Sequence, residues 1–217
     1  MKRKAKTHVW HQRHVNDFYV KQAVGQGYRS RAAFKLLEID DRDRLFRPGI
    51  YVVDLGCTPG GWCQVASERM HGQGRIIGLD LLEMTPVAHV HFIQGDFTED
   101  ATLDLLEAEL AGKAVDLVIS DMAPNITGIL ASDQAKSYAL AELAMDFARQ
   151  RLKPDGVFLV KVFQGEGFEP FMKAVRAAFR SVAARKPKAS REQSREVYLL
   201  AKGLRGVDVI DPIREME

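Results

Sequence analysis

The sequence contains few cysteines and no long apolar run. Cys57 and Cys63 are the only cysteines among 217 residues, too few for a disulfide framework or a cysteine-rich metal site. No apolar stretch approaches the roughly 20 residues of a membrane span, and the first residues are charged where a secretory signal would be apolar. We therefore expect a cytoplasmic protein with reduced thiols and no membrane-spanning segment.

The sequence also lacks an even distribution of charge. The net charge is only +2, yet residues 1–35 hold nine Lys or Arg and one acid, and residues 180–205 hold eight against two. The residues between these segments hold 13 basic and 22 acidic side chains. Two basic segments on an acidic body predict a surface that binds a polyanion, provided that the fold brings them together. The alternative is a disordered basic tail beside a solvated surface.

Helix-like and strand-like segments alternate from residue 29 onward. Apolar runs between turn residues predict strands, and apolar residues at helical spacing predict helices, two of them with Ser30 and Ser132 as candidate N-caps. The expected helices cover 30–42, 61–70, 99–112, 133–152 and 168–179, and the expected strands cover 49–56, 74–80, 89–96, 114–121, 156–165, 181–186 and 196–202.

This alternation predicts a Rossmann-like α/β fold. Strands that alternate with helices form βαβ units, so we expect a mostly parallel central sheet with helices on both faces. The last two strands have no long helix between them, which predicts an antiparallel hairpin at one edge. We divide the chain into a basic N-terminal arm (1–28), one domain (29–205) and a C-terminal tail (206–217), and we expect a monomer.

A glycine-rich turn follows the first predicted strand, in VVDLGCTPGGW (52–62). Gly56 and Gly60 allow a tight turn and a close approach of the backbone to a ligand. The turn lacks the Gly-Lys-Ser/Thr of a phosphate-binding loop and the G-x-G-x-x-G of a dinucleotide site. An aspartate at the end of the strand, Asp54, suits a cationic or amine-bearing ligand better than a pyrophosphate. These features point to S-adenosylmethionine as the cofactor.

Two further acids end the next two predicted strands. Asp80 lies where an acid of this kind of fold can hold ribose hydroxyls. Asp96 could accept a hydrogen bond from an adenine amino group, and Trp62 could pack near the ligand. A helix cap or a solvated loop residue is the alternative for each acid alone, but three acids at successive strand ends favour a nucleoside cofactor.

Lys161 lies inside the apolar run GVFLVKVFQG (156–165). A buried ammonium group is costly unless it is paired or gives up its proton. If the strand ending at Asp121 is a neighbour, Asp121 and Lys161 share one cleft, and Lys35 and Glu196 could complete a cluster in which each charge has a partner. The alternative is an edge strand whose lysine extends its charged end to water.

These motifs resemble the FtsJ family of RNA 2′-O-ribose methyltransferases. The resemblance extends from about Tyr28 to Lys202 and is carried by SRAAFKL, VDLGCTPGGW, LD, QGDF, SDMAPN, VKVFQGEGF and SREVY, in this order. It is greatest to bacterial members that methylate a uridine in 23S ribosomal RNA of the large ribosomal subunit. The pair Cys57-Thr58 departs from the pattern, since bacterial relatives have small residues such as alanine in this turn.

The resemblance implies which residues catalyse the reaction and which bind the cofactor. Its catalytic set falls on Lys161, Asp121, Lys35 and Glu196, and its cofactor contacts fall on Gly56, Gly60, Trp62, Asp80, Asp96 and Asp121. A ribose hydroxyl is a poor nucleophile, and a neutral lysine amine can accept its proton. We therefore expect Lys161 to be the general base, with Asp121 and Lys35 positioning it and Glu196 in a lesser supporting role.

The expected partner is ribosomal RNA. Residues 2–35 and the stretch RKPKASREQSR (185–195) supply basic side chains for phosphate contacts, and Trp10, Tyr19 or Tyr28 could stack on an unpaired base. The identity of the RNA rests on the resemblance alone.

Other functions remain open at this stage. His8, His11 and His14 are spaced by three, but they lack carboxylate or cysteine partners, so we expect no metal site. The alternatives are methylation of transfer RNA or another RNA by the same chemistry, and a non-catalytic RNA-binding assembly factor. A nicotinamide-dependent oxidoreductase would need a dinucleotide loop that the sequence does not contain.

Overall fold

The computed structural model describes residues 17–124, 127–191 and 193–206. Most of the predicted basic arm, with its three histidines and Trp10, lies outside the described residues, as does nearly all of the C-terminal tail. Within the described part of the chain, no helix has the length and apolar character that crossing a membrane requires.

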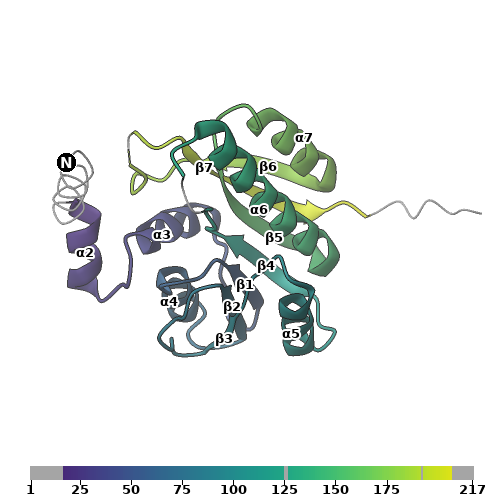
Figure 1. The fold of residues 1–217 in the computed structure, drawn as a ribbon. Coiled ribbons are helices and arrows are strands. Elements are labelled where there is room, and N and C mark those ends of the chain that lie inside the picture. The colour runs from purple at the N-terminus through teal and green to yellow at the C-terminus, as the bar shows by residue number, and fades with distance from the viewer. Residues whose placement is uncertain (1–16, 125–126, 192, 207–217) are drawn as a thin grey trace, which may run out of the picture.

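The core of the fold is a seven-stranded sheet with the order β3-β2-β1-β4-β5-β7-β6 (Figure 1). β7 is antiparallel to both β5 and β6, and the other pairs are parallel. This confirms the predicted mostly parallel sheet with an antiparallel pair at one edge. The strands are β1 (Tyr51–Leu55), β2 (Arg75–Asp80), β3 (Val90–Gln94), β4 (Val115–Ser120), β5 (Leu152–Phe163), β6 (Phe179–Arg185) and β7 (Glu196–Leu204).

Helices cover both faces of the sheet (Figure 1). Successive strand side chains point to opposite faces, so in β1 Val52 belongs to the apolar cluster that includes α3 and α4, while Val53 belongs to the cluster that includes α5, α6 and α7. Each face therefore has its own apolar core, as expected for strands buried on both sides. The helices are α3 (Ala32–Asp43), α4 (Gly61–Arg69), α5 (Asp100–Leu110), α6 (Leu130–Arg151) and α7 (Phe168–Ala178).

One helix was not predicted. The segment Phe18–Gln26 forms α2, although the sequence analysis assigned it to the basic arm. Asp17 caps its start by accepting a hydrogen bond from the backbone of Tyr19, and Gly27 ends it in the left-handed conformation. Tyr19 packs on Phe34 of α3, with 5.7 Å between ring centroids. The apolar residues of α2 show little helical periodicity. In the sequence the helix is therefore indicated only by Asp17 and Gly27 at its ends and by one short apolar face.

Both predicted N-caps were wrong. α3 begins after Arg31 and α6 begins after Ile129, so Ser30 and Ser132 do not occupy the cap positions. At α6, the carboxylate of Asp133 accepts hydrogen bonds from the backbone N–H groups of Thr127 (2.8 Å) and Gly128 (2.9 Å). A carboxylate within the first turn thus binds the donors of the preceding loop, and the helix starts earlier than a serine cap would allow.

The sheet topology locates the binding edge. The strand order reverses between β1 and β4, and ligands of such sheets bind at the carboxyl ends of the strands beside this reversal. β5 lies between β4 and β7. Lys161 is therefore on an interior strand with 8% of its surface exposed, and the alternative of an edge-strand lysine is wrong.

Candidate active site

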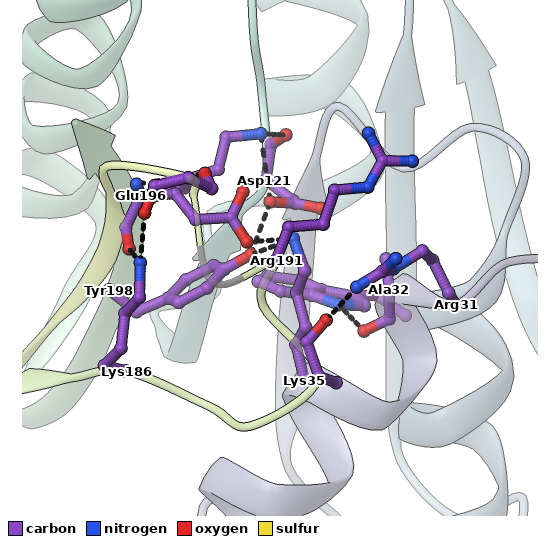
Figure 2. Close-up of polar contacts among 12 residues, drawn as sticks. Arg31, Ala32, Lys35, Asp121, Lys186, Arg191, Glu196 and Tyr198 are labelled. Carbon is purple, nitrogen blue, oxygen red and sulfur yellow. Dashed lines mark hydrogen bonds and ion pairs between the residues drawn. The ribbon is translucent and has the colours of Figure 1, made fainter. Parts of the chain in front are cut away.

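The four residues of the predicted catalytic set meet at this edge of the sheet. Lys161 Nζ lies 3.0 Å from Asp121 Oδ1 and donates a hydrogen bond of 2.6 Å to the backbone oxygen of Asp121. Lys35 Nζ lies 2.6 Å from Glu196 Oε1 (Figure 2). Each ammonium group therefore has a carboxylate partner.

Strand register explains why these residues meet. Ser120, the last residue of β4, is in register with Val160 of β5, so Asp121 follows directly beside Lys161. Because β7 runs in the opposite direction, its first residue, Glu196, lies at the same edge as the last residues of the parallel strands. Lys35 reaches the cluster from α3, which packs on the face of the sheet that also carries Tyr198.

Tyr198 is a member of the cluster that the sequence analysis missed. Its hydroxyl donates to Asp121 Oδ1 at 2.9 Å and accepts a hydrogen bond from Lys35 Nζ at 3.1 Å (Figure 2). The signal was present, because Tyr198 lies two residues after Glu196 on the same face of β7. It is also in register with Lys161. Tyr198 thus joins the two ion pairs into one network.

The cluster is buried, and its charges determine the protonation of its acids. Burial alone raises the pKa of Asp121, but the charges of Lys161 and Lys35 outweigh it and leave the pKa below its usual range. The pKa of Glu196 is likewise raised by burial and lowered further by Lys35, so it is low overall. Burial, with the nearby carboxylates, holds the pKa of Tyr198 well above its usual range. At neutral pH both acids are ionised and the phenol keeps its proton.

A cleft of about 910 Å³ opens beside the cluster. Lys35, Lys161 and Glu196 line it together with basic residues from two distant segments of the chain, namely Arg31 and the pair Lys188 and Arg191. The fold therefore brings the described part of the N-terminal basic segment and the late basic segment to one cleft. This meets the condition on which the predicted polyanion-binding surface depended.

Not every basic residue of the stretch 185–195 faces this cleft. The guanidinium of Arg185 donates two hydrogen bonds of 2.7 Å to the carboxylate of Asp43, at the end of α3. Lys186 Nζ donates to the backbone oxygens of Ser194 (2.5 Å) and Glu196 (2.6 Å). These two side chains fasten the loop between β6 and β7 to the domain and to itself, which leaves Lys188 and Arg191 for the cleft.

The glycine turn lies after β1, next to this cluster. Gly56 has φ +79°, and a Cβ atom there would lie 2.5 Å from Cγ of Met122. Only glycine therefore fits between the turn and the chain that follows β4. The turn leads into α4, whose first backbone N–H groups have no partners within the helix and can bind a ligand.

The acids after β2 and β3 are held by backbone groups. Asp80 accepts hydrogen bonds of 2.8 Å from the N–H groups of Thr58 and Leu82, one on each oxygen. Asp96 Oδ1 accepts from the backbone and hydroxyl of Thr98, which lowers the pKa of Asp96. Both carboxylates are thereby oriented, and each keeps lone pairs for a hydroxyl or amino donor.

The loop after β2 exposes two large apolar residues beside Asp80. Leu81 and Leu82 expose 59% and 63% of their surfaces although both are large and apolar. A flat aromatic base can pack on such exposed side chains. Their position next to an acid at a strand end was the available signal.

The side chain of Trp62 is buried in the interior. Only 3% of its surface is exposed, its indole N–H donates to the backbone oxygen of Ala32 at 2.8 Å, and its ring packs on Tyr198 with 5.7 Å between centroids. A contact between Trp62 and a cofactor would therefore come from its backbone N–H in the first turn of α4.

Asp54 provides a test of the predicted cofactor. It is completely buried, and one oxygen accepts a hydrogen bond from the thiol of Cys63 at 3.2 Å. The other oxygen has no partner among the described residues. Burial, together with the charges of Asp121 and Asp80, raises the pKa of Asp54 to about 7. Three carboxyl groups lie around the turn, those of Asp54, Asp80 and Asp121. Such an acidic environment suits a ligand with a sulfonium and an ammonium group.

Comparison with known proteins decides the family. A family model described as FtsJ-like methyltransferase matches residues 28–204. The chain belongs to the FtsJ-like methyltransferase family. Curated relatives from Azoarcus sp. (strain BH72) and Methylobacillus flagellatus, both named Ribosomal RNA large subunit methyltransferase E, are 61% and 58% identical. The alignments cover 94% and 92% of this chain and 100% and 97% of the relatives.

Solved structures agree with this assignment. A crystal structure from Plasmodium falciparum, described as a ribosomal RNA methyltransferase, has a TM-score of 0.75 and 33% identity and covers 83% of this chain and 100% of that chain. MycE, a methyltransferase of the mycinamycin biosynthetic pathway solved with Mg and SAH, has a TM-score of 0.54 at 15% identity and covers 80% of this chain and 47% of that chain. The second match shows the fold alone.

These matches confirm several predictions. They confirm the predicted family, the Rossmann-like methyltransferase fold, the class of enzyme and S-adenosylmethionine as the cofactor of this FtsJ-like enzyme. The oxidoreductase alternative is thereby excluded. The roles of the individual residues stay predictions.

Proposed function

We propose that this FtsJ-like enzyme methylates the 2′-hydroxyl of a uridine in 23S ribosomal RNA of the large subunit. The names of its relatives support the substrate. The observation that carries the proposal is the position of Lys161, paired with Asp121, in a cleft whose wall carries Arg31, Lys188 and Arg191. Phosphate groups on either side of a ribose would bind such guanidinium and ammonium groups.

The cofactor half of the site is formed by the loops after β1, β2 and β3. When bound, S-adenosylmethionine supplies an electrophilic methyl group. Gly56 and Gly60 would bring the backbone close to it, Asp80 would accept from its ribose hydroxyls and Asp96 from its adenine amino group. Asp121 would face both the cofactor and the catalytic cluster, since it pairs with Lys161 and the next residue, Met122, lies against Gly56 of the turn.

Lys161 would act as the general base. In its neutral form Nζ accepts the proton of the 2′-hydroxyl as the ribose oxygen attacks. Asp121 fixes the direction of the amine, because Lys161 Nζ lies 3.0 Å from its Oδ1 and donates a hydrogen bond of 2.6 Å to its backbone oxygen. Lys35, held by Glu196 and Tyr198, would position Asp121 and the ribose.

Transfer of a labelled methyl group tests the function. The enzyme is incubated with labelled S-adenosylmethionine and with ribosomal subunits, free ribosomal RNA and transfer RNA from cells that lack this gene. We expect 2′-O-methylation of one uridine of the large-subunit RNA. Label only in transfer RNA would keep the chemistry and overturn the substrate, and cofactor binding without any label would favour a non-catalytic assembly factor.

A further inference from the structure

Arg29 and Arg31 belong to one basic segment, but their side chains go to different places. Arg31 donates to the backbone oxygen of Ala189, pairs with Asp17 and lines the cleft. Arg29 instead reaches away from this cleft to the loops that follow β1 and β2. A charge count alone assigns both residues to RNA binding, whereas the contacts separate them.

The guanidinium of Arg29 joins the two loops. Nη1 donates to the backbone oxygens of Pro59 (3.2 Å) and Thr85 (2.5 Å), and Nη2 donates to that of Pro86 (2.6 Å). The first oxygen belongs to the glycine turn, and the other two belong to the loop after Asp80. A guanidinium presents several donors in a fixed plane, so one side chain can hold three carbonyl groups at once.

The backbone next to Arg29 is also held in place. Its N–H donates to Gln64 Oε1 at 2.9 Å, and Gln64 Nε2 donates to the backbone oxygen of Gly27 at 3.0 Å. Gln64 belongs to α4, the helix that begins directly after the glycine turn. The segment 27–29 therefore lies along α4, and the guanidinium starts from a fixed position.

Two neighbouring glycines make room for this segment. A Cβ atom at Gly60 would lie 2.9 Å from Nη1 of Arg29, and a Cβ atom at Gly61 would lie 2.5 Å from Oγ of Ser30. The pair Gly60-Gly61 thus fits against the pair Arg29-Ser30. The glycines of the turn serve this packing as well as the approach of a ligand.

We propose that Arg29 is a positioning residue for the cofactor site, and that it holds the loops after β1 and β2 in the arrangement that binds S-adenosylmethionine. These loops carry Gly56, Gly60 and Asp80. Thr58 makes a second link between them, because its N–H donates to Asp80 and its hydroxyl donates to the backbone oxygen of Leu82 at 3.1 Å. Arg29 closes the arrangement from the outer side.

Matched alanine variants test the proposal. Arg29→Ala is expected to weaken binding of S-adenosylmethionine to the RNA-free protein by about 10- to 100-fold, the usual range for lost hydrogen bonds to a charged group. Its affinity for RNA without cofactor should change less than about threefold. Arg191→Ala, which removes a more exposed guanidinium that lines the cleft, is expected to show the reverse, a contrast that rests on the proposed RNA substrate. Calorimetry measures the first affinity and filter binding the second.

Amide hydrogen exchange separates positioning from general destabilisation. In Arg29→Ala, the amides of 56–61 and 81–89 should exchange faster while those of β1, β4 and β5 keep their protection. Arg29→Lys, which retains one donor group, should give intermediate exchange and intermediate cofactor affinity.

The outcomes distinguish this proposal from the proposed function. Wild-type cofactor affinity and loop exchange in Arg29→Ala would overturn the positioning role, as would loss of RNA affinity without loss of cofactor affinity. If wild-type protein binds S-adenosylmethionine but methylates no RNA, the proposed substrate fails while the role of Arg29 remains measurable.

Discussion

Lys161 is a buried charged residue and requires polar partners. Asp121, which directly follows β4, supplies both oxygens that surround this buried group, one from its carboxylate and one from its backbone. Removing one partner from such a buried ion pair usually costs about 3–5 kcal/mol, since the other charge is left unpaired. The apolar run of β5 therefore accommodates Lys161 where it borders the cleft and meets Asp121.

Lys161→Arg tests the assignment of the general base. Arginine keeps the positive charge but does not lose its proton in proteins, so we expect methyl transfer to fall by at least about a hundredfold. Binding of S-adenosylmethionine should be nearly unchanged. Lys153→Arg, at the other end of β5, is the matched control and should keep wild-type activity. Near-normal transfer by Lys161→Arg would remove lysine as the base.

Asp54 predicts how stability depends on pH in the cofactor-free protein. Its pKa is raised to about 7 in the folded state, so the stabilising contribution of its proton is complete below about pH 4 and is lost as the pH rises to about 7. Between pH 5 and 7.5 the free energy of unfolding should fall by about 2.5 kcal/mol through this group. Urea unfolding of Asp54→Asn should lack this component, while the exposed Asp146→Asn should retain it. Equal pH dependence in all three proteins would contradict the assignment.

At the scale of helices and turns, the glycines differ in what surrounds them. Gly56 has a positive φ and the Met122 side chain against it, whereas a Cβ atom at Gly25 of α2 would meet nothing within 4 Å. Glycine is thus required in the turn and dispensable in the helix.

Two alanine substitutions check this difference. Gly25→Ala should stabilise the protein by roughly 0.5–1 kcal/mol, because alanine loses less conformational freedom in a helix. Gly56→Ala should lower both the melting temperature and the affinity for S-adenosylmethionine. Differential scanning calorimetry with and without cofactor measures both effects. A Gly56→Ala protein with normal cofactor affinity would show that the turn adapts.

The sequence predicted the elements whose signals are local and strong. The apolar runs of β1, β4 and β5 lie between turn residues, so both their type and the acids at their ends could be assigned. α2 could not be assigned, because its stability comes from packing of Tyr19 on Phe34 of a different helix. Tyr198 was missed for a related reason, since its role depends on the register between β5 and β7.

At the scale of the whole molecule, the fold brings distant charges together. Arg31 and Arg191 are far apart in sequence, yet both line one cleft with Lys161. Charge counting located the basic segments, but it could not tell that Arg185 is bound to Asp43 while Arg191 faces the cleft. That distinction depends on how the loop between β6 and β7 folds back on α3.

Salt dependence of RNA binding tests the role of the cleft. Each lost phosphate contact lowers the slope of log K against log salt by about 0.7 for single-stranded RNA. Arg191→Ala should show a reduction of this size and unchanged affinity for S-adenosylmethionine. Lys113→Ala is the control, because it removes a basic group at the amino ends of β1 and β4, opposite the carboxyl ends that form the site. Equal slopes for the two variants would place the RNA elsewhere.

The reversed direction of β7 separates the two halves of the reaction along the chain. In the proposed mechanism the loops after β1, β2 and β3 serve the methyl donor, whereas the loop between β6 and β7 forms a wall of the cleft and ends at Glu196. Exchange of this loop between related enzymes could therefore redirect the enzyme to another RNA without rebuilding its donor site. This wall of the cleft is a single surface segment, anchored at both ends by Arg185 and Glu196.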